Sequence, residues 1–144
     1  MLKTPFYTLI ALLSVGLLSL GCKGETPPSE SNKMAEVIAV HDEVMPKMSE
    51  IGKLVAQLKP MADSSETGLP YLKAMRDLQD AHAAMMDWMK GFGDRFDYEE
   101  VMEGKPLSPE KIALLKDEEV KVKAMRDLVF QSITSAEKIL DEAQ

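Results

Sequence analysis

The sequence predicts an all-α fold, an antiparallel three-helix bundle with room for a short fourth helix. Three long segments carry apolar residues at every third or fourth position, the period of a helix with one buried face. Proline and glycine residues separate these segments. No stretch after Gly21 alternates apolar and polar residues as a half-buried strand does. Short connections between the long helices favour antiparallel neighbours.

The chain opens with a predicted signal peptide over residues 1–21. Lys3 is followed by an uncharged apolar run from Phe6 to Leu20. This run of about 15 residues is shorter than the roughly 20 that a membrane-spanning helix needs. A basic start and a short apolar stretch are typical of a secretory signal that is removed.

The signal ends in Leu-Ser-Leu-Gly-Cys at residues 18–22, which resembles a lipobox with Ser19 and Leu20 in swapped order. The resemblance implies cleavage before Cys22 and attachment of lipid to its sulfur. Two acyl chains on Cys22 anchor a protein stably to a membrane. Because Cys22 is the only cysteine, it cannot form an intramolecular disulfide. The alternative is an ordinary signal peptide that happens to have a cysteine nearby.

Residues 22–32 are rich in proline, serine and glycine and are predicted to be a flexible tether between the lipid and the domain. The helical domain is expected to occupy residues 33–144. No Asp follows Cys22 directly, which by analogy with lipoprotein sorting favours the outer membrane, on its periplasmic or surface side.

The charge of the chain excludes nucleic acid as a partner. The full chain carries a net charge of −7, and removal of the signal, with its single Lys3, makes this −8. A negative chain without a basic cluster is repelled by phosphate backbones and by anionic lipid. We therefore expect the membrane to be contacted through the lipid on Cys22. The sequence identifies no partner protein in the envelope.

The first helix is predicted over residues 33–59. Pro46 should kink or restart it, and Pro60 should end it. Its predicted apolar stripe is Met34, Val37, His41, Val44, Met48, Ile51, Val55 and Leu58.

The second helix is predicted over residues 70–90, with Pro70 in the first helical position. Gly91 and Gly93 are expected to terminate it. Its predicted stripe is Met75, Leu78, His82, Met85 and Met89, widened by Met86 and Trp88.

The third helix is predicted over residues 109–142, with Ser108 as its N-cap. Its predicted stripe is Leu115, Val122, Met125, Val129, Ser132, Ala136 and Leu140. The preceding connection contains a potential helical turn at residues 98–103. Its aromatic residues Phe92, Phe96 and Tyr98 are expected to cap one end of the core.

The first two predicted helices each contain the motif His-x-x-x-Met-x-x-Met. Side chains four and seven residues apart share one helix face. A hairpin that turns near Ser65 makes the two motifs face each other. The pairs that should then meet are His41 with Met89, Met48 with His82, and Met45 with Met86.

Imidazole and thioether groups together suit soft ions, above all Cu(I). Thiolates outside the cytoplasm oxidise to disulfides, whereas methionine does not form them. The sequence therefore predicts a Cu(I) site of His41, Met45, Met48, His82, Met86 and Met89, which resembles periplasmic copper chaperones in ligand type only. Two alternatives stay open: a methionine-rich core with a structural or protein-binding role, and haem bound by His and Met.

No catalytic constellation is present in the sequence, and we predict that the protein is not an enzyme. The di-iron motif Glu-x-x-His is missing, because Ile38 and Gln79 stand three residues before the histidines. The zinc-protease motif and a glycine-rich phosphate loop are missing as well. No serine or cysteine nucleophile has plausible partners.

Two segments, residues 40–54 and 78–92, resemble conserved blocks of small helical lipoproteins from Bacteroidetes-type bacteria. These lipoproteins are often labelled "viral A-type inclusion protein". The resemblance covers most of the chain after the signal. It implies an envelope location and a helical fold, and it supplies no established function.

Overall fold

The computed structural model describes residues 30–143, which form five helices and no strand within that range. The all-α class is therefore confirmed. The predicted signal peptide, Cys22 and residues 22–29 of the tether lie outside the described residues. The helices are α1 (Glu30–Val44), α2 (Lys47–Leu58), α3 (Leu69–Gly93), α4 (Tyr98–Met102) and α5 (Pro109–Glu142).

Pro46 divides the first predicted helix into α1 and α2. Proline has no N–H to donate and its ring clashes with the preceding turn, so the helix restarts at Lys47. The amide of Met45 still donates to the carbonyl of His41 at 2.9 Å, and the amide of Met48 donates to the carbonyl of Met45 at 3.2 Å. The interruption is therefore a single tight turn. The start of α1 at Glu30 also places the end of the predicted tether in a helix.

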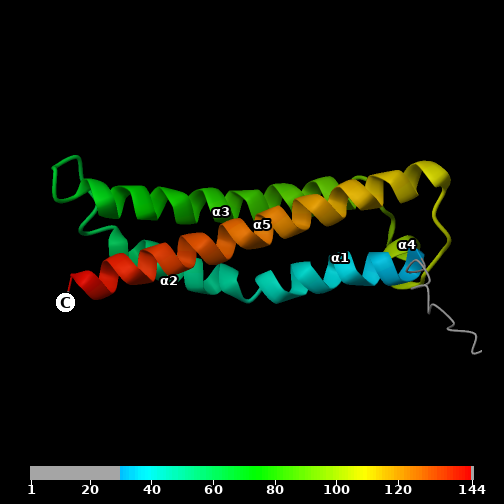
Figure 1. The fold of residues 1–144 in the computed structure, drawn as a ribbon, viewed down its shortest axis with the longest axis horizontal. Coiled ribbons are helices and arrows are strands. Elements are labelled where there is room, and N and C mark those ends of the chain that lie inside the picture. Colours follow the sequence, from blue (N-terminus) through cyan, green and yellow to red (C-terminus); the bar gives the residue numbers. More distant parts are fainter. Residues whose placement is uncertain (1–29, 144) are drawn as a thin grey trace, which may run out of the picture.

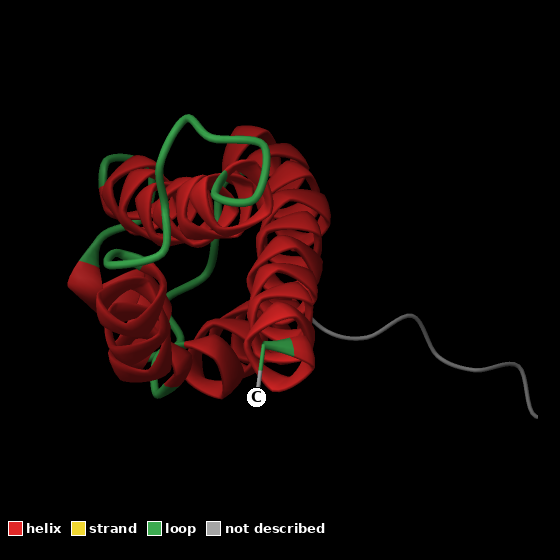
Figure 2. Ribbon diagram, turned by 90° about the vertical axis from the view of Figure 1, so that its left-hand side faces the viewer, coloured by secondary structure: helices red, strands yellow, loops and turns green. Residues whose placement is uncertain are grey.

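The long helices lie lengthwise against one another (Figure 1). The most extensive contact is between α3 and α5, while α1 packs on α5, and α2 packs on both α3 and α5. In Figure 1, α3 runs opposite to α1, α2 and α5. Seen from the end that holds the α2–α3 loop, the helices are arranged around a common interior, and α5 slants along one side of it (Figure 2). None of the helices within residues 30–143 has the length and apolar character needed to span a bilayer.

The buried face of α3 differs from the predicted one. Leu78 and Met85 are buried as predicted, but His82 and Met89 are exposed. Large aromatic side chains remove the most apolar surface from water, so their burial sets the rotation of the helix. Small residues fill the remaining buried positions and allow close approach of the neighbouring helices. The complete buried face is Ala74, Leu78, Ala81, Met85, Trp88 and Phe92.

The end of α3 also differs from the prediction. The helix continues through Gly91 to Gly93, and its C-cap is Asp94 in a right-handed conformation. Lys90 forms an ion pair with Asp94 at 2.9 Å across this last turn. Neither glycine adopts the positive φ that ends many helices, so neither acts as a helix terminator.

The aromatic residues after α3 are divided between core and surface. Phe92 and Phe96 are buried, as predicted for the end of the core. Tyr98 is 69% exposed, so its predicted place in the core is wrong. It is the first residue of the short helix α4, whose existence confirms the predicted helical turn.

Most of the predicted core face of α5 is buried, and the oxygen of Ser108 caps the helix by accepting from the amide of Lys111. The sequence prediction missed Glu118, whose side chain is 2% exposed. Arg95 and Lys121 both form ion pairs with its carboxylate, Lys121 at 3.0 Å. Because a buried carboxylate is stable only with such partners, these two cations make the position tolerable.

Replacement of Arg95 by Ala should lower the free energy of unfolding by about 1–3 kcal/mol, because the buried carboxylate loses a charged hydrogen-bond donor. Glu118→Leu should be nearly neutral, since Arg95 and Lys121 both reach solvent and are not left buried. Urea unfolding followed by circular dichroism measures both variants. A larger loss for Glu118→Leu than for Arg95→Ala would contradict this account.

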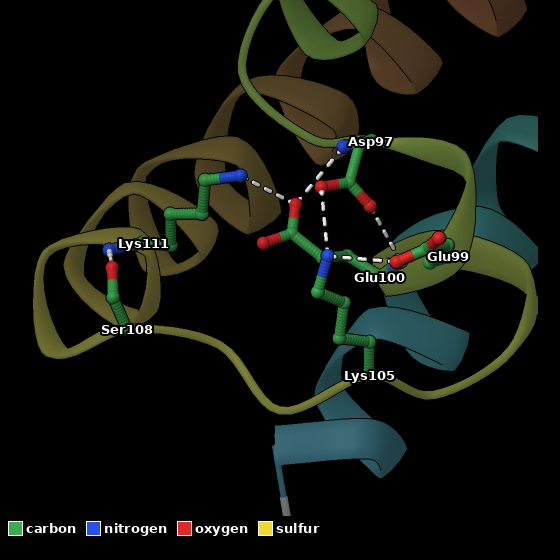
Figure 3. A network of polar contacts seen from close by, with 6 residues as sticks. All are labelled: Asp97, Glu99, Glu100, Lys105, Ser108 and Lys111. Carbon is green, nitrogen blue, oxygen red and sulfur yellow. Dashed lines mark hydrogen bonds and ion pairs between the residues drawn. The ribbon is translucent and has the colours of Figure 1, made fainter.

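A polar network fixes α4 against the start of α5 (Figure 3). Asp97 and Glu100 form a capping box, in which each side chain accepts from the backbone amide of the other. Lys111 of α5 pairs with the buried Glu100, and this hydrogen bond holds the pKa of Glu100 below its ordinary value. Lys105 donates to Glu99 at 2.7 Å and closes the turn after α4. These contacts hold the five-residue helix α4 against the start of α5.

A second ion-pair cluster connects the first turn of α1 with the middle of α5. Lys33 donates to Glu119 at 2.7 Å and Lys123 donates to it at 2.6 Å. Hydrogen bonds from Lys123 and Lys33 lower the pKa of Glu119 to about 2. The folded protein thus prefers the ionised carboxylate more strongly than the unfolded chain does.

The contribution of Glu119 to stability should be complete above the unfolded pKa of about 4.3 and should disappear as the pH falls towards 2. Glu119→Gln should therefore be less stable than the wild type at pH 7 and equally stable at pH 2. Urea unfolding at pH 7, 4 and 2 tests this, with Glu66→Gln in the exposed α2–α3 loop as the matched control. An unchanged difference at every pH would show that the ion pairs contribute nothing.

Candidate functional site

The six predicted ligands lie in two separate places and not in one stretch of core. His41 and Met89 line one pocket, and Met48 and His82 line another. Two of the three predicted pairs between the motifs therefore share a pocket. Met45 and Met86 line neither pocket and are 38% and 39% exposed.

Two features of the chain explain why the six residues separate. The restart at Pro46 places Met45 in the turn between α1 and α2. The burial of Trp88 and Phe92 rotates α3 and brings its histidine and Met86 to the surface. The equal spacing of the two motifs in the sequence is not matched by equal burial in the fold.

The imidazole of His41 is held in a defined orientation beside Trp88. Its side chain is 19% exposed, and its Nδ1 lies 2.9 Å from Oδ1 of Asp42. A carboxylate can only accept, so in the neutral ring Nδ1 carries the proton and Nε2 carries the lone pair. The rings of His41 and Trp88 lie 5.6 Å apart between centroids at a tilt of 32°. Histidines that bind metal usually donate their other ring nitrogen to a carboxylate, a carbonyl or water in this way.

The pocket beside His41 is an open groove of about 280 Å³ among α1, α3 and the α4 region. Two thioethers line it: Met89 of α3, which is 38% exposed, and Met102 of α4, which is 65% exposed. The sequence analysis missed Met102 because it lies outside the repeated motif. Only the placement of α4 against α1 and α3 brings Met102 to this groove. The remaining lining is mostly apolar and comprises Ile38, Trp88, Phe92, Gly93, Phe96, Asp97, Tyr98 and Val101.

Aromatic rings form the inner wall of this groove. Trp88 stacks on Phe92 at 4.9 Å and 28°, and Phe92 contacts Phe96 at 4.9 Å. Trp88 is 8% exposed, and its Nε1 has no hydrogen-bond partner among the described residues. The electron-rich face of an indole attracts cations. The groove thus combines an imidazole, two thioethers and an aromatic wall.

The pocket beside His82 is less well organised. It has about 260 Å³ and also contains Met48, Gln79 and small or aliphatic residues of α2. His82 is exposed, and no hydrogen bond or ring contact orients it within the described part of the chain. Two potential ligands without an orienting partner make a weaker site than the groove beside His41.

A larger cavity of about 470 Å³ lies between α3 and α5. Its charged lining residues are Asp87, Arg95, Glu118 and Lys121, and both Arg95 and Lys121 pair with Glu118. Within residues 30–143, no three His, Cys, Asp or Glu side chains are grouped so that they could hold a metal ion. The groove beside His41 is therefore distinguished by its thioethers.

No protein-family model, curated protein or solved structure matches this chain. The resemblance to small helical lipoproteins stays a prediction from residues 40–54 and 78–92.

Proposed function

We propose that this protein is a lipid-anchored, non-enzymatic lipoprotein of the bacterial envelope, and that its antiparallel three-helix bundle binds Cu(I) beside His41. One observation carries the copper assignment. His41, Met89 and Met102 come from three different helices and line one groove, where Asp42 orients the imidazole.

The ligand chemistry favours Cu(I) over harder ions. Two thioethers and a neutral imidazole form a soft, uncharged ligand set, which suits a monovalent soft cation. Carboxylates of Asp42 and Asp97 lie at His41 and in the groove lining, where they compensate the charge of the ion. The aromatic face of Trp88 further favours a cation.

This ligand set revises the one predicted from the two motifs. His41 and Met89 are retained and Met102 is added, whereas Met48 and His82 form a second, weaker site. Met45 and Met86 lie outside both pockets. The groove beside His41 has only about 280 Å³ and is walled by Trp88, Phe92 and Phe96, which favours a small ion over a macrocycle such as haem.

The membrane anchor in this proposal is lipid on Cys22, followed by the short tether to α1. Acylation of the only cysteine leaves the mature chain without a free thiol. Soft-metal binding then depends on methionine and histidine, which do not form disulfides in the envelope. The anchor and the ligand set are chemically consistent with each other.

Copper binding is tested by titrating the mature chain with Cu(I) under reducing conditions in competition with a chromogenic chelator. His41→Ala and Met89→Leu should each weaken the affinity by at least about tenfold, and Asp42→Ala by about tenfold through loss of orientation. His82→Ala is the matched control and should have a smaller effect, because His82 belongs to the other pocket.

Acidification should weaken the Cu(I) affinity of the wild type more than that of His41→Ala, because protons compete with the metal for the imidazole lone pair. If the wild type and His41→Ala compete equally with the chelator at every pH, His41 does not bind Cu(I) and the copper proposal is wrong. Circular dichroism of each variant shows that the helices are intact.

The anchor is tested by expressing the full chain in a bacterium that processes lipoproteins. The wild type should fractionate with membranes and have the mass of residues 22–144 plus acyl chains, whereas Cys22→Ser should be released from the membrane. A wild-type chain that is cleaved but carries no lipid would overturn the anchor.

A further inference from the structure

The end of the molecule that carries α4 presents apolar side chains that no described residue covers. Tyr98 is 69% exposed and Met102 is 65% exposed, although both belong to a helix that a capping box and Lys111 hold rigidly. Met89 adds a third partly exposed apolar side chain on the adjoining groove. Exposed apolar residues gathered on a fixed element indicate a contact surface.

This surface lies at the same end as the first residue of α1 (Figure 1). A second groove confirms the proximity, because it is lined by Met34 and Ile38 of α1 together with Glu100 and Val101 of α4. The α2–α3 loop lies at the opposite end, and α5, with its 34 residues, extends about 50 Å between the two ends.

The length of chain before α1 limits how far this end can lie from an anchored Cys22. Eight residues of sequence lead from Cys22 to Glu30, and a fully extended chain covers at most about 29 Å over that distance. A lipid on Cys22 therefore keeps Glu30, which lies at the α4 end, within about 29 Å of the bilayer, while the far end can be much more distant. Such tethering gives a weak surface contact a high effective concentration.

We propose that Tyr98 and Met102 dock the α4 end on the lipid surface to which the protein is anchored. The inference rests on the proposed anchor at Cys22. Tyrosine is favoured at the boundary between headgroups and acyl chains, where its ring is apolar and its hydroxyl meets water. Asp97, Glu99 and Glu103 flank the two side chains in the sequence, and Lys105 offsets only part of their negative charge. The surface that fits is therefore a zwitterionic one, and anionic lipid weakens the contact.

The test is hydrogen exchange of the acylated mature protein, residues 22–144, measured by mass spectrometry, in phosphatidylcholine–phosphatidylethanolamine vesicles and in detergent. Amides of residues 97–107 should exchange several-fold more slowly in vesicles than in detergent, and amides of residues 62–67 should not change. Tyr98→Ser should abolish the protection. Val120→Ser replaces an equally exposed apolar residue of α5, at 69%, and should leave the protection intact.

Met102→Leu separates this inference from the copper proposal, because it removes the thioether and keeps an apolar side chain. The variant should retain vesicle protection and lose Cu(I) affinity. Acylated protein without protection at residues 97–107 overturns the docking and leaves the anchor standing. A chain that carries no lipid overturns both, and protection that persists in Tyr98→Ser overturns the role of this surface.

Discussion

The burial of Trp88 of α3 against His41 of α1 is the interaction on which the rest of the structure depends. Its indole is 8% exposed, lies against the imidazole of His41 and begins the aromatic series that continues through Phe92 to Phe96. Burial of an aromatic side chain of this size stabilises a core by about 3–5 kcal/mol relative to Ala. This burial sets the rotation of α3, and hence which of its methionines and histidines reach solvent. It also forms the wall of the groove in which His41 and Met89 meet.

The sequence predicted the helices well because their signals are local. Pro46, Pro60 and Ser108 act on the backbone of their own turn, and each acted where it was predicted to act. The glycines near the end of α3 were misjudged, because a glycine permits a helix to end without requiring it to do so. The burial of Glu118 was not predicted either. Its partner Arg95 comes from a distant part of the chain, so no local sequence pattern indicates their contact.

The candidate site could be predicted only in part. Opposite placement of the two motifs follows from the hairpin length, and the pairs of His41 with Met89 and of Met48 with His82 did share pockets. A common burial of all six residues does not follow, because periodicity alone cannot decide whether a Met–His face or an alanine–aromatic face is buried. Apolar area decides between them, and the aromatic face has more of it. The place of Met102 in the groove could not be predicted from the sequence, because it depends on the polar network that fixes α4.

The separation of buried and exposed methionines has a consequence for function. Met85 and Met125 fill the core, where a flexible side chain adapts to irregular space. Met89 and Met102 are accessible beside an oriented imidazole, where a thioether can act as a ligand. The same residue type thus serves packing in one place and is available for chemistry in another. The number of methionines in the sequence does not by itself distinguish these two roles.

X-ray absorption spectroscopy of the mature protein, loaded with one equivalent of Cu(I), tests most directly whether His41, Met89 and Met102 bind the metal. We expect one nitrogen and two sulfur neighbours around copper. The nitrogen should be lost in His41→Ala, whereas His82→Ala should leave the spectrum unchanged. A spectrum without sulfur neighbours, or a nitrogen that persists in His41→Ala, would contradict the account.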